Sequence, residues 1–484
     1  MSKDGNKRRG KQHTKIDEST TPRQPLVWAD LLQRALTWAI DEKIFAEFKK
    51  HGNTKWVASQ LVVLAVLWVW SDQATLTGAF RDAHQLAVKM FGDIAVASYQ
   101  GLTGALLTWT ASILSVLWPH LHSLMEAFGG DYWRIGRWLP LAVDGSRAST
   151  PRTKSNEAAF SAKKYGHGSK AKSRSKWRNK KRRTRRLAES VTPQIWLTLI
   201  WHMGLGMPWC WKTGPSTASE RHHFLDLLKC LIFPKDTLFC CDAGFVGYDL
   251  WKALLDDGHQ LLIRVGGNVR LLTGLCRVKR SGDIVYLWPK DAASRGDLPL
   301  ILRLLKFQGP RGMVYLVTSV LSEKDLTWRN AKDLYKMRWG IELQFRSLKQ
   351  TFGRGKLRSR TADNALVELE WSLVGLWLVQ LFAVKEQIEI DSPPKRSSVA
   401  LALAVIRDAM RCPDSVVPNP RALAQRLAMA VKDQYTRHSS KQARYKTSGK
   451  DQPSATKPIL SAATAAQREA YANLRRLQEK SLTA

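Results

Sequence analysis

The spacing of apolar residues divides the chain into helical and strand-forming stretches. Between about residues 25 and 130, Trp and Leu recur every three or four positions, as in VWADLLQRALTWAI and TKWVASQLVVLAVLWVW, which predicts an all-helical region. From residue 137 the period changes, and short apolar runs bounded by Gly, Pro and Asp predict strands. These runs include WLPLAV, QIWLTLIWHMG, PWCWKTG, TLFCC and HQLLIRV. Helical patterns return after residue 325, so the order predicts an α/β fold between two helical regions.

Two of the predicted strands are followed at once by an aspartate. WLPLAV leads to Asp144 and a predicted loop, GSRAST, whereas TLFCC leads to Asp242. We expect these strands to be neighbours in one sheet, which would place both carboxylates at the same edge. A single aspartate at a strand end is more often a turn or cap residue, so a third acid is needed before a site is inferred.

The third acid lies in the stretch DLTWRNAKDLYKMRWGIELQFRSLKQTF, residues 325 to 352, which predicts one continuous helix. At about 100° per residue, Tyr335, Arg338, Glu342 and Lys349 fall within about 60° of arc, with Arg346 close beside them. The adjacent face is apolar, and a glycine suited to a helix C-cap follows: Met337, Ile341, Phe345, Leu348, Phe352 and Gly353. A solvated face with an Arg–Glu pair one turn apart is the alternative interpretation.

The charge of the chain points to a polyanionic partner. Its 484 residues include 76 Lys and Arg against 41 acids, giving a formal net charge of +35 and a pI near 10.2. Residues 163–186 alone carry 13 basic residues and no acid. Such a run cannot form a core, and it suits contact with phosphates, although a solvated or targeting-like basic run is the alternative. We therefore expect nucleic acid as the partner.

Several classes of protein are disfavoured by the same sequence. The six cysteines include no CxxC pair and no zinc-ligand spacing, so we expect reduced thiols in the cytosol. The basic N-terminal stretch lacks a signal-peptide core, and the apolar runs at 61–70 and 371–384 are too short to cross a bilayer. No Gly-rich phosphate loop is present. The expectation is a cytoplasmic, nucleoid-associated protein with no membrane partner.

Three converging carboxylates would create a specific chemistry. Their mutual repulsion is relieved by hard divalent cations, Mg²⁺ or Mn²⁺. Two such ions about 4 Å apart support in-line phosphoryl transfer. The predicted metal ligands are Asp144, Asp242 and Glu342.

The run Y-x2-R-x3-E-x6-K, formed by Tyr335, Arg338, Glu342 and Lys349, resembles the signature of the bacterial DDE insertion-sequence transposases of family four. LAVDGS around Asp144, CCDAGF around Asp242 and the strand-like TSV before the signature are similar as well. The resemblance covers about residues 137–385. It implies an RNase H-like catalytic core with a β-rich insertion, in which Tyr335, Arg338 and Lys349 hold DNA phosphates; we add Arg346 to that set because of its place on the helix. The basic segment 163–186 is longer than such a core requires.

The resemblance implies the domain organisation and partners. We expect a basic arm at 1–24, a helical DNA-binding domain at 25–130, a catalytic domain at 131–385 and a helical, basic C-terminal region at 386–484. Within the catalytic domain we expect a basic loop at 151–190 and a β-rich insertion at about 266–312. The implied partners are terminal inverted repeats and target DNA, bound by a homodimer.

The implied activity is cut-and-paste transposition: nicking with water, formation and reopening of a DNA hairpin, and joining of 3′-OH ends to target DNA. Two alternatives stay open, a decayed basic DNA-binding protein of the same fold and a metal-dependent nuclease that does not join strands. Members of this group hold a flipped base by stacking, for which Trp288, Trp328 and Trp339 are candidates.

Overall fold

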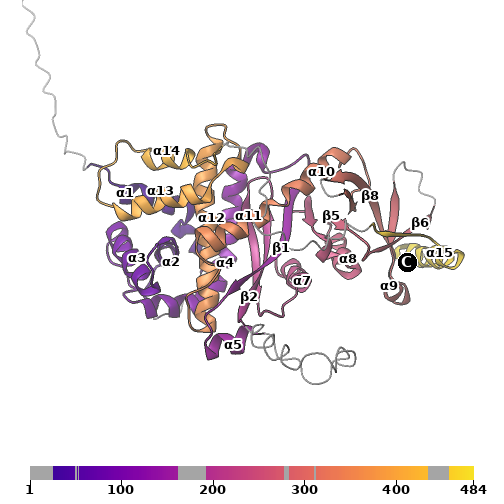
Figure 1. Cartoon of the computed structure of the whole chain (residues 1–484), viewed down its shortest axis with the longest axis horizontal. Coiled ribbons are helices and arrows are strands. Elements are labelled where there is room, and N and C mark those ends of the chain that lie inside the picture. The colour runs from indigo at the N-terminus through magenta and orange to yellow at the C-terminus, as the bar shows by residue number, and fades with distance from the viewer. Residues whose placement is uncertain are drawn as a thin grey trace, which may run out of the picture.

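A ten-stranded mixed sheet runs through the middle of the molecule, with helices packed around it (Figure 1). The computed structural model describes residues 25–48, 52, 54–161, 192–276, 283–309, 312–433 and 457–483. The strands, in the order in which they lie side by side, are β10 (Ile459–Ala462), β6 (Arg270–Thr273), β7 (Ile284–Leu287), β8 (Leu300–Gly309), β9 (Gly312–Thr318), β5 (Gln260–Val265), β4 (Thr237–Cys241), β1 (Leu139–Ser149), β2 (Gln194–His202) and β3 (Met207–Gly214). The predicted mixed α/β fold with helical flanks is confirmed.

Strand β1 is longer than the sequence predicts. It was expected to end at Asp144 with a loop after it, but it continues to Ser149. The reason is its neighbour β2, which pairs antiparallel with β1 from Leu141 to Ser149 and so carries the strand past Asp144. On the other side the parallel partner β4 stops at Cys241, opposite Val143. Asp144 is therefore the first residue of β1 that lies beyond the end of β4.

The helices before the sheet are α1 (Trp28–Ala39), η1 (Glu42–Phe45), α2 (Ala58–Trp70), α3 (Leu76–Phe91), α4 (Tyr99–Gly129) and η2 (Gly130–Tyr132). Those after it are α12 (Ala362–Ile388), η6 (Pro394–Arg396), α13 (Val399–Arg411) and α14 (Ala422–Ala428). The two groups share one core, because α12 packs against α2, α4, α13 and α14. In Figure 1 they form the helical block beside the sheet, with α12 and α4 at its inner edge.

Helix α12 carries apolar residues around almost its whole circumference, and it is surrounded by other parts of the protein. Within the described residues, two segments are long and apolar enough to cross a membrane by length and composition, namely 99–132 and 362–388. In the apolar window of α12, 94% of the residues are buried inside the molecule, whereas 39% are buried in the window of α4. Burial of this degree is typical of the core helix of a large domain.

The range predicted as a β-rich insertion contains three strands, β6, β7 and β8, and they extend the central sheet. Strands β6, β7 and β8 follow one another to β9, with α9 (Lys290–Ser294) between β7 and β8. At the far edge β10 pairs in parallel with β6, and α15 (Ala465–Thr483) buries Tyr471 against the insertion. Figure 1 shows β6, α9 and α15 at the end of the molecule away from α1 and α3. Strand β10 was not predicted.

The helix expected to run unbroken from residue 325 to 352 is three segments. Helix α10 (Trp328–Met337), capped by Thr327, is followed by a two-residue turn, α11 (Gly340–Arg346) and the π-helical turn η5 (Ser347–Thr351). Gly353 then has a φ of 68°, the left-handed conformation expected of the predicted C-cap. The prediction of one regular helix is wrong, because a period fitted to apolar residues does not detect a turn or a π-bulge.

The remaining helices are α5 (Lys154–Phe160), α7 (Glu220–Cys230), η4 (Ala243–Phe245) and α8 (Tyr248–Asp256). Of these, α7 packs on β1, β2 and β3, and α8 packs on β5 and β8. The predicted arm at 1–24 and the basic run at 163–186 lie outside the described residues.

Candidate active site

The candidate site lies at the carboxyl end of β4, where β1 continues without it. Asp144 is on β1, and its Oδ1 accepts a hydrogen bond from the backbone N–H of Gly145 at 2.8 Å. Asp242 follows β4 directly and caps η4, with its Oδ1 accepting from the N–H of Gly244 at 2.7 Å. In each carboxylate, Oδ1 thus accepts a hydrogen bond from a backbone N–H group one or two residues later. The other oxygen, Oδ2, takes no part in these two hydrogen bonds.

The signature arginine lies against the first aspartate. Nη1 of Arg338 is 3.7 Å from Oδ2 of Asp144, and the arginine is buried, with only 7% of its side chain exposed. Arg338 occupies the turn between α10 and α11, with its guanidinium 5.4 Å from the ring centre of Tyr335. Burial lowers the pKa of Arg338, but Tyr335, Asp144 and Asp242 together raise it above the usual value. The guanidinium therefore stays charged at this site.

Burial raises the pKa of Asp144 to about 6, although the Gly145 N–H and Arg338 both lower it. Asp242 and Glu342 are close enough to raise it further by repulsion. Asp144 thus has Asp242, Glu342 and Arg338 as charged neighbours. Glu342 comes from the first turn of α11, which packs on β1.

The other predicted phosphate-binding residues differ in accessibility. Tyr335 is buried, and Arg346 is exposed in the last turn of α11. Lys349 is partly buried on η5, and burial lowers its pKa. Since η5 is π-helical, Lys349 does not occupy the stripe position that a regular helix would give it.

A fourth carboxylate, Glu220, was missed by the sequence analysis. It begins α7, and its neighbours include Asp144 and Asp242. Burial raises the pKa of Glu220 to about 7, repulsion from these two aspartates adds to this, and Arg147 and Arg221 oppose it. Acids are common in the first turn of a helix because they interact favourably with the helix dipole, so the position of Glu220 in the sequence did not indicate a functional site. A Cβ at Gly145, directly after Asp144, would lie 2.6 Å from Cγ of Glu220, so this glycine was the available clue.

The donor set fits a hard divalent cation by its chemistry. Asp242 and Glu342 repel Asp144, and Asp144 and Asp242 repel Glu220; carboxylate oxygens are the ligands that Mg²⁺ and Mn²⁺ prefer. With the side chains as placed, no three Asp, Glu, His or Cys residues of the described part of the chain are grouped tightly enough to share one ion. Binding of an ion by all three predicted ligands would therefore require these side chains to move closer together.

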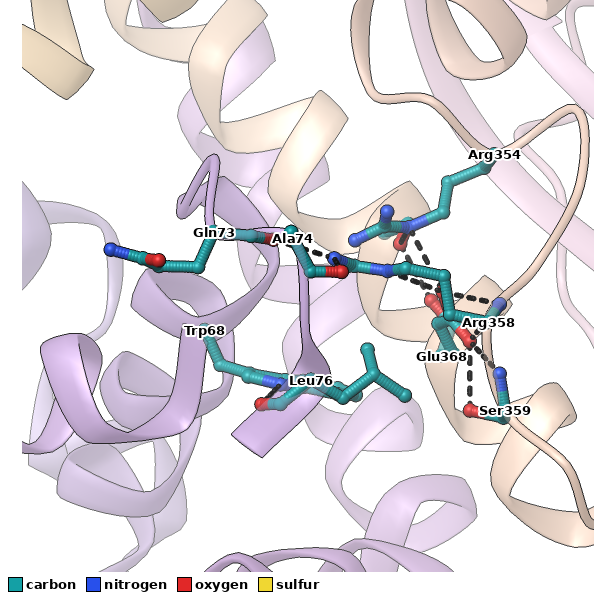
Figure 2. A network of polar contacts seen from close by, with 9 residues as sticks. Trp68, Gln73, Ala74, Leu76, Arg354, Arg358, Ser359 and Glu368 are labelled. Atoms are coloured by element: carbon teal, nitrogen blue, oxygen red, sulfur yellow. Dashed lines mark hydrogen bonds and ion pairs between the residues drawn. The ribbon is translucent and has the colours of Figure 1, made fainter. Parts of the chain in front are cut away.

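A buried ionic network supports the segment that follows Glu342. Glu368 of α12 is fully buried and accepts hydrogen bonds from the N–H of Arg358 at 3.0 Å and from the N–H and Oγ of Ser359 at 2.9 and 2.7 Å (Figure 2). Nε of Arg354 and of Arg358 lie 3.6 and 3.7 Å from the same carboxylate. Arg358 also donates to the carbonyl of Gln73, in the α2–α3 loop, at 2.7 Å. The network ties α12, the segment 354–359 and the α2–α3 loop together.

The three tryptophans considered for base stacking have different environments. Trp288 is buried and donates to the carbonyl of Asp297. Trp328 is 41% exposed and donates to the carbonyl of Lys306. Trp339 is 59% exposed and lies three residues before Glu342. Of the three, Trp339 is the most accessible ring near the acids.

Residues 139–378 match the family model described as the transposase DDE domain. The match begins with β1 and ends within α12, so it includes all the acids described above, and it supports a DDE transposase. No curated protein matches the chain. Among solved structures, the chain is similar to the cryo-EM structure of a piggyBac transposase synaptic complex with hairpin DNA, with 11% sequence identity and a TM-score of 0.37. That alignment covers 86% of this chain and 88% of the other.

Proposed function

We propose, from the transposase DDE domain match at residues 139–378, that this protein cuts transposon ends and joins the freed 3′-OH ends to target DNA. The observation that carries the proposal is the position of the elements that bear the three acids: β1 with Asp144 pairs in parallel with β4, Asp242 directly follows β4, and α11 with Glu342 packs on β1. We propose that this sheet is an RNase H-like core, in which a central strand and its parallel neighbour each supply one acid; the parallel pairing of β1 with β4 supports this.

Asp144, Asp242 and Glu342 would hold two divalent cations, which when bound activate an attacking oxygen and stabilise the leaving one. In the first reaction, water attacks the phosphorus, the bond to the 3′-oxygen breaks, and that oxygen leaves with a proton as a 3′-OH. In the joining reaction the 3′-OH attacks a target phosphodiester and a target 3′-oxygen leaves. Attack of the 3′-OH on the opposite strand would give the hairpin.

The basic residues have separate roles in this proposal. Arg338 is buried beside Asp144, so it limits the negative charge at the site and holds a phosphate oxygen when DNA binds. Tyr335 packs against Arg338 and fixes its position. Lys349 and Arg346 would contact phosphates farther along the DNA, and Arg346 is freely accessible.

Double-stranded DNA, as transposon inverted repeats and target, is the proposed partner, bound by a homodimer. The formal net charge of +35 supports this, since phosphate contacts by Lys and Arg dominate such binding. We propose that residues 25–130 contribute to DNA binding, with 131–385 as the catalytic domain and 386–484 as the C-terminal region. The proposed location is the cytoplasm, at the nucleoid.

The test uses supercoiled DNA that carries the inverted repeats flanking the gene, incubated with the full chain and Mg²⁺. Nicks, hairpins and joined products are expected. The variants Asp144→Asn, Asp242→Asn and Glu342→Gln should each abolish cleavage while leaving end binding nearly unchanged. Asp256→Asn, which removes an exposed acid paired with Lys252 on α8, is the matched control and should cleave normally.

Two results would overturn the proposal. Binding without any cleavage by the unmodified chain would indicate a decayed DNA-binding protein, and cleavage without joining would indicate a nuclease. If Glu342→Gln still cuts, Glu342 is not the third ligand.

A further inference from the structure

We propose that an open cavity between the helical block and the segment 358–361 binds a backbone phosphate of DNA, away from the acids. The cavity has a volume of about 440 Å³ and lies where α3, α4 and α12 begin. We name it the α3–α12 cavity. The polar residues of its lining that carry the argument are Thr75, Thr77, Tyr99, Arg358, Arg360 and Asn364. The inference rests on the proposed function in taking DNA as the partner.

The lining of the α3–α12 cavity carries positive charge. Arg358 and Arg360 belong to it, and no Asp or Glu does. The buried carboxylate of Glu368 is shared by Arg358 and Arg354, so one positive charge of this group is left over. Arg360 is exposed, and within the described part of the chain it forms no ion pair. An anion that enters the cavity therefore meets two positive charges that no carboxylate balances.

The walls of the cavity are ordered without a ligand. Nη1 of Arg358 donates to the carbonyls of Gln73 and Ala74 at 2.7 and 3.2 Å, which joins the α2–α3 loop to the segment before α12 (Figure 2). Nε1 of Trp68 donates to the carbonyl of Leu76, in the first turn of α3, at 3.1 Å. Walls that are already fixed lower the entropic cost of binding.

Neutral donors stand beside the arginines. Burial raises the pKa of Tyr99, the Glu368 charge raises it further, and Arg358 opposes both. The phenol therefore stays protonated at neutral pH and can donate a hydrogen bond. Its ring is held 6.1 Å from that of Trp68. Arginine together with Thr, Tyr and Asn side chains is the usual set of groups that contact DNA phosphates.

The three helix starts favour an anion as well. Thr75 caps α3, Tyr99 is the first residue of α4, and Thr361 is the N-cap of α12. The first N–H groups of a helix have no partner inside the helix, and this end carries partial positive charge. The hydroxyl of Thr361 does not cap α12, and Asp363 in its first turn does not line the cavity. These helix ends strengthen a site that the two arginines define.

DNA bound at the acids can reach the cavity. Asp144 and Ser149 are five residues apart on β1, about 17 Å at about 3.3 Å per residue. The N–H of Leu357 donates to the carbonyl of Ser149 at 2.8 Å, and Arg360 follows three residues later, at most about 11 Å farther. Arg360 is therefore no more than about 35 Å from Asp144, which is about one turn of a DNA duplex.

The experiment measures binding of the full chain, without metal, to a duplex that carries one inverted repeat flanking the gene, at several salt concentrations. Arg360→Gln should make the slope of log K against log salt shallower by about one, with an unchanged melting temperature because the side chain is exposed. Tyr99→Phe should weaken binding with the slope unchanged, because it removes a neutral donor. Arg270→Gln, exposed on β6 at the far end of the sheet (Figure 1), is the matched control.

Neutral methylphosphonates, placed at one position of the duplex at a time, identify the phosphate. We expect one position, within about ten nucleotides of the end of the inverted repeat, where neutralisation weakens binding by the unmodified chain and by Arg270→Gln. The same neutralisation should have little further effect on Arg360→Gln, because the two changes remove one contact.

The inference is overturned if no position shows this pairing with Arg360→Gln, or if that variant keeps the salt slope of the unmodified chain. Binding of inorganic phosphate that Arg360→Gln abolishes, with DNA binding unchanged, would indicate a small-anion site and overturn it as well. If the pairing is found but Mg²⁺ gives no cleavage, the proposed function fails and the phosphate site stands. Normal cleavage without the pairing refutes the phosphate site alone.

Discussion

The substitution Glu368→Gln directly tests the buried ionic network of α12 and the segment 354–359. The carboxylate is fully buried, and its closest charged partner, Arg354, has only 5% of its side chain exposed. Removing the charge leaves Arg354 with Oγ of Ser372, at 2.8 Å, as its remaining partner. The substitution also replaces one carboxylate oxygen by an NH₂ group, which cannot accept the hydrogen bonds that the backbone N–H groups of Arg358 and Ser359 donate to Glu368.

Breaking a buried ion pair by neutralising one member costs about 3–5 kcal/mol, because the other charge stays buried without compensation. Most of this cost arises from Arg354, since Arg358 is more exposed and its contribution is screened by solvent. We therefore expect Glu368→Gln to lower the free energy of unfolding by about 3–5 kcal/mol. Denaturation by urea, followed by tryptophan fluorescence, measures this change.

The matched control is Glu389→Gln, at the C-cap of the same helix, where the acid pairs with Arg421 and Lys385 at the surface. Exposed pairs contribute about 0–1 kcal/mol, so this variant should be nearly unchanged. The double variant Glu368→Gln, Arg354→Met should recover part of the loss, because no buried charge remains. A loss below about 1 kcal/mol for Glu368→Gln would refute the reasoning.

Two further predictions concern α12. Burial raises the pKa of Glu370 to about 7 from its ordinary 4.5, against a hydrogen bond from Thr213 that lowers it, so the folded state keeps a proton that the unfolded chain releases. The free energy of unfolding should therefore fall as pH rises from about 4.5 to 7. In urea titrations, Glu370→Gln should be more stable than the unmodified chain by up to ~3 kcal/mol at pH 8 and equally stable at pH 4. An equal difference at both pH values would contradict this. A Cβ at Gly375 would lie 2.6 Å from Val69, so Gly375→Ala should force α12 from α2 and cost about 1–3 kcal/mol. The control Gly104→Ala, in open space on α4, should gain about 0.5–1 kcal/mol, and equal effects in the two variants would refute this explanation.

The sequence predicted the parts of the fold that depend on local pattern. The strands leading to Asp144 and Asp242 were recognised because buried β runs are short and apolar, and Gly353 because a helix end favours a residue with positive φ. The length of β1 was not predicted, since it is set by pairing with β2 and not by its own residues. The same holds for β10, a four-residue strand whose only support is its neighbour β6.

The site was predicted in part for the same reason. Asp144, Asp242 and Glu342 stand in recognisable sequence surroundings, whereas Glu220 becomes visible only when the space above Gly145 is known. The position of Lys349 on a helical wheel assumes a constant period, and η5, on which this residue lies, departs from that period. The burial of Arg338 against Asp144 was likewise a property of packing between α11 and β1.

Strand β10 has a consequence for the order of folding. It pairs with a strand 188 residues earlier in the chain, so a very long segment must be closed before the contact forms. During synthesis the outer side of β6 stays open until residues 459–462 have emerged. An open strand edge recruits other chains, so this border of the sheet is where self-association should begin in a slowly maturing or partly unfolded molecule.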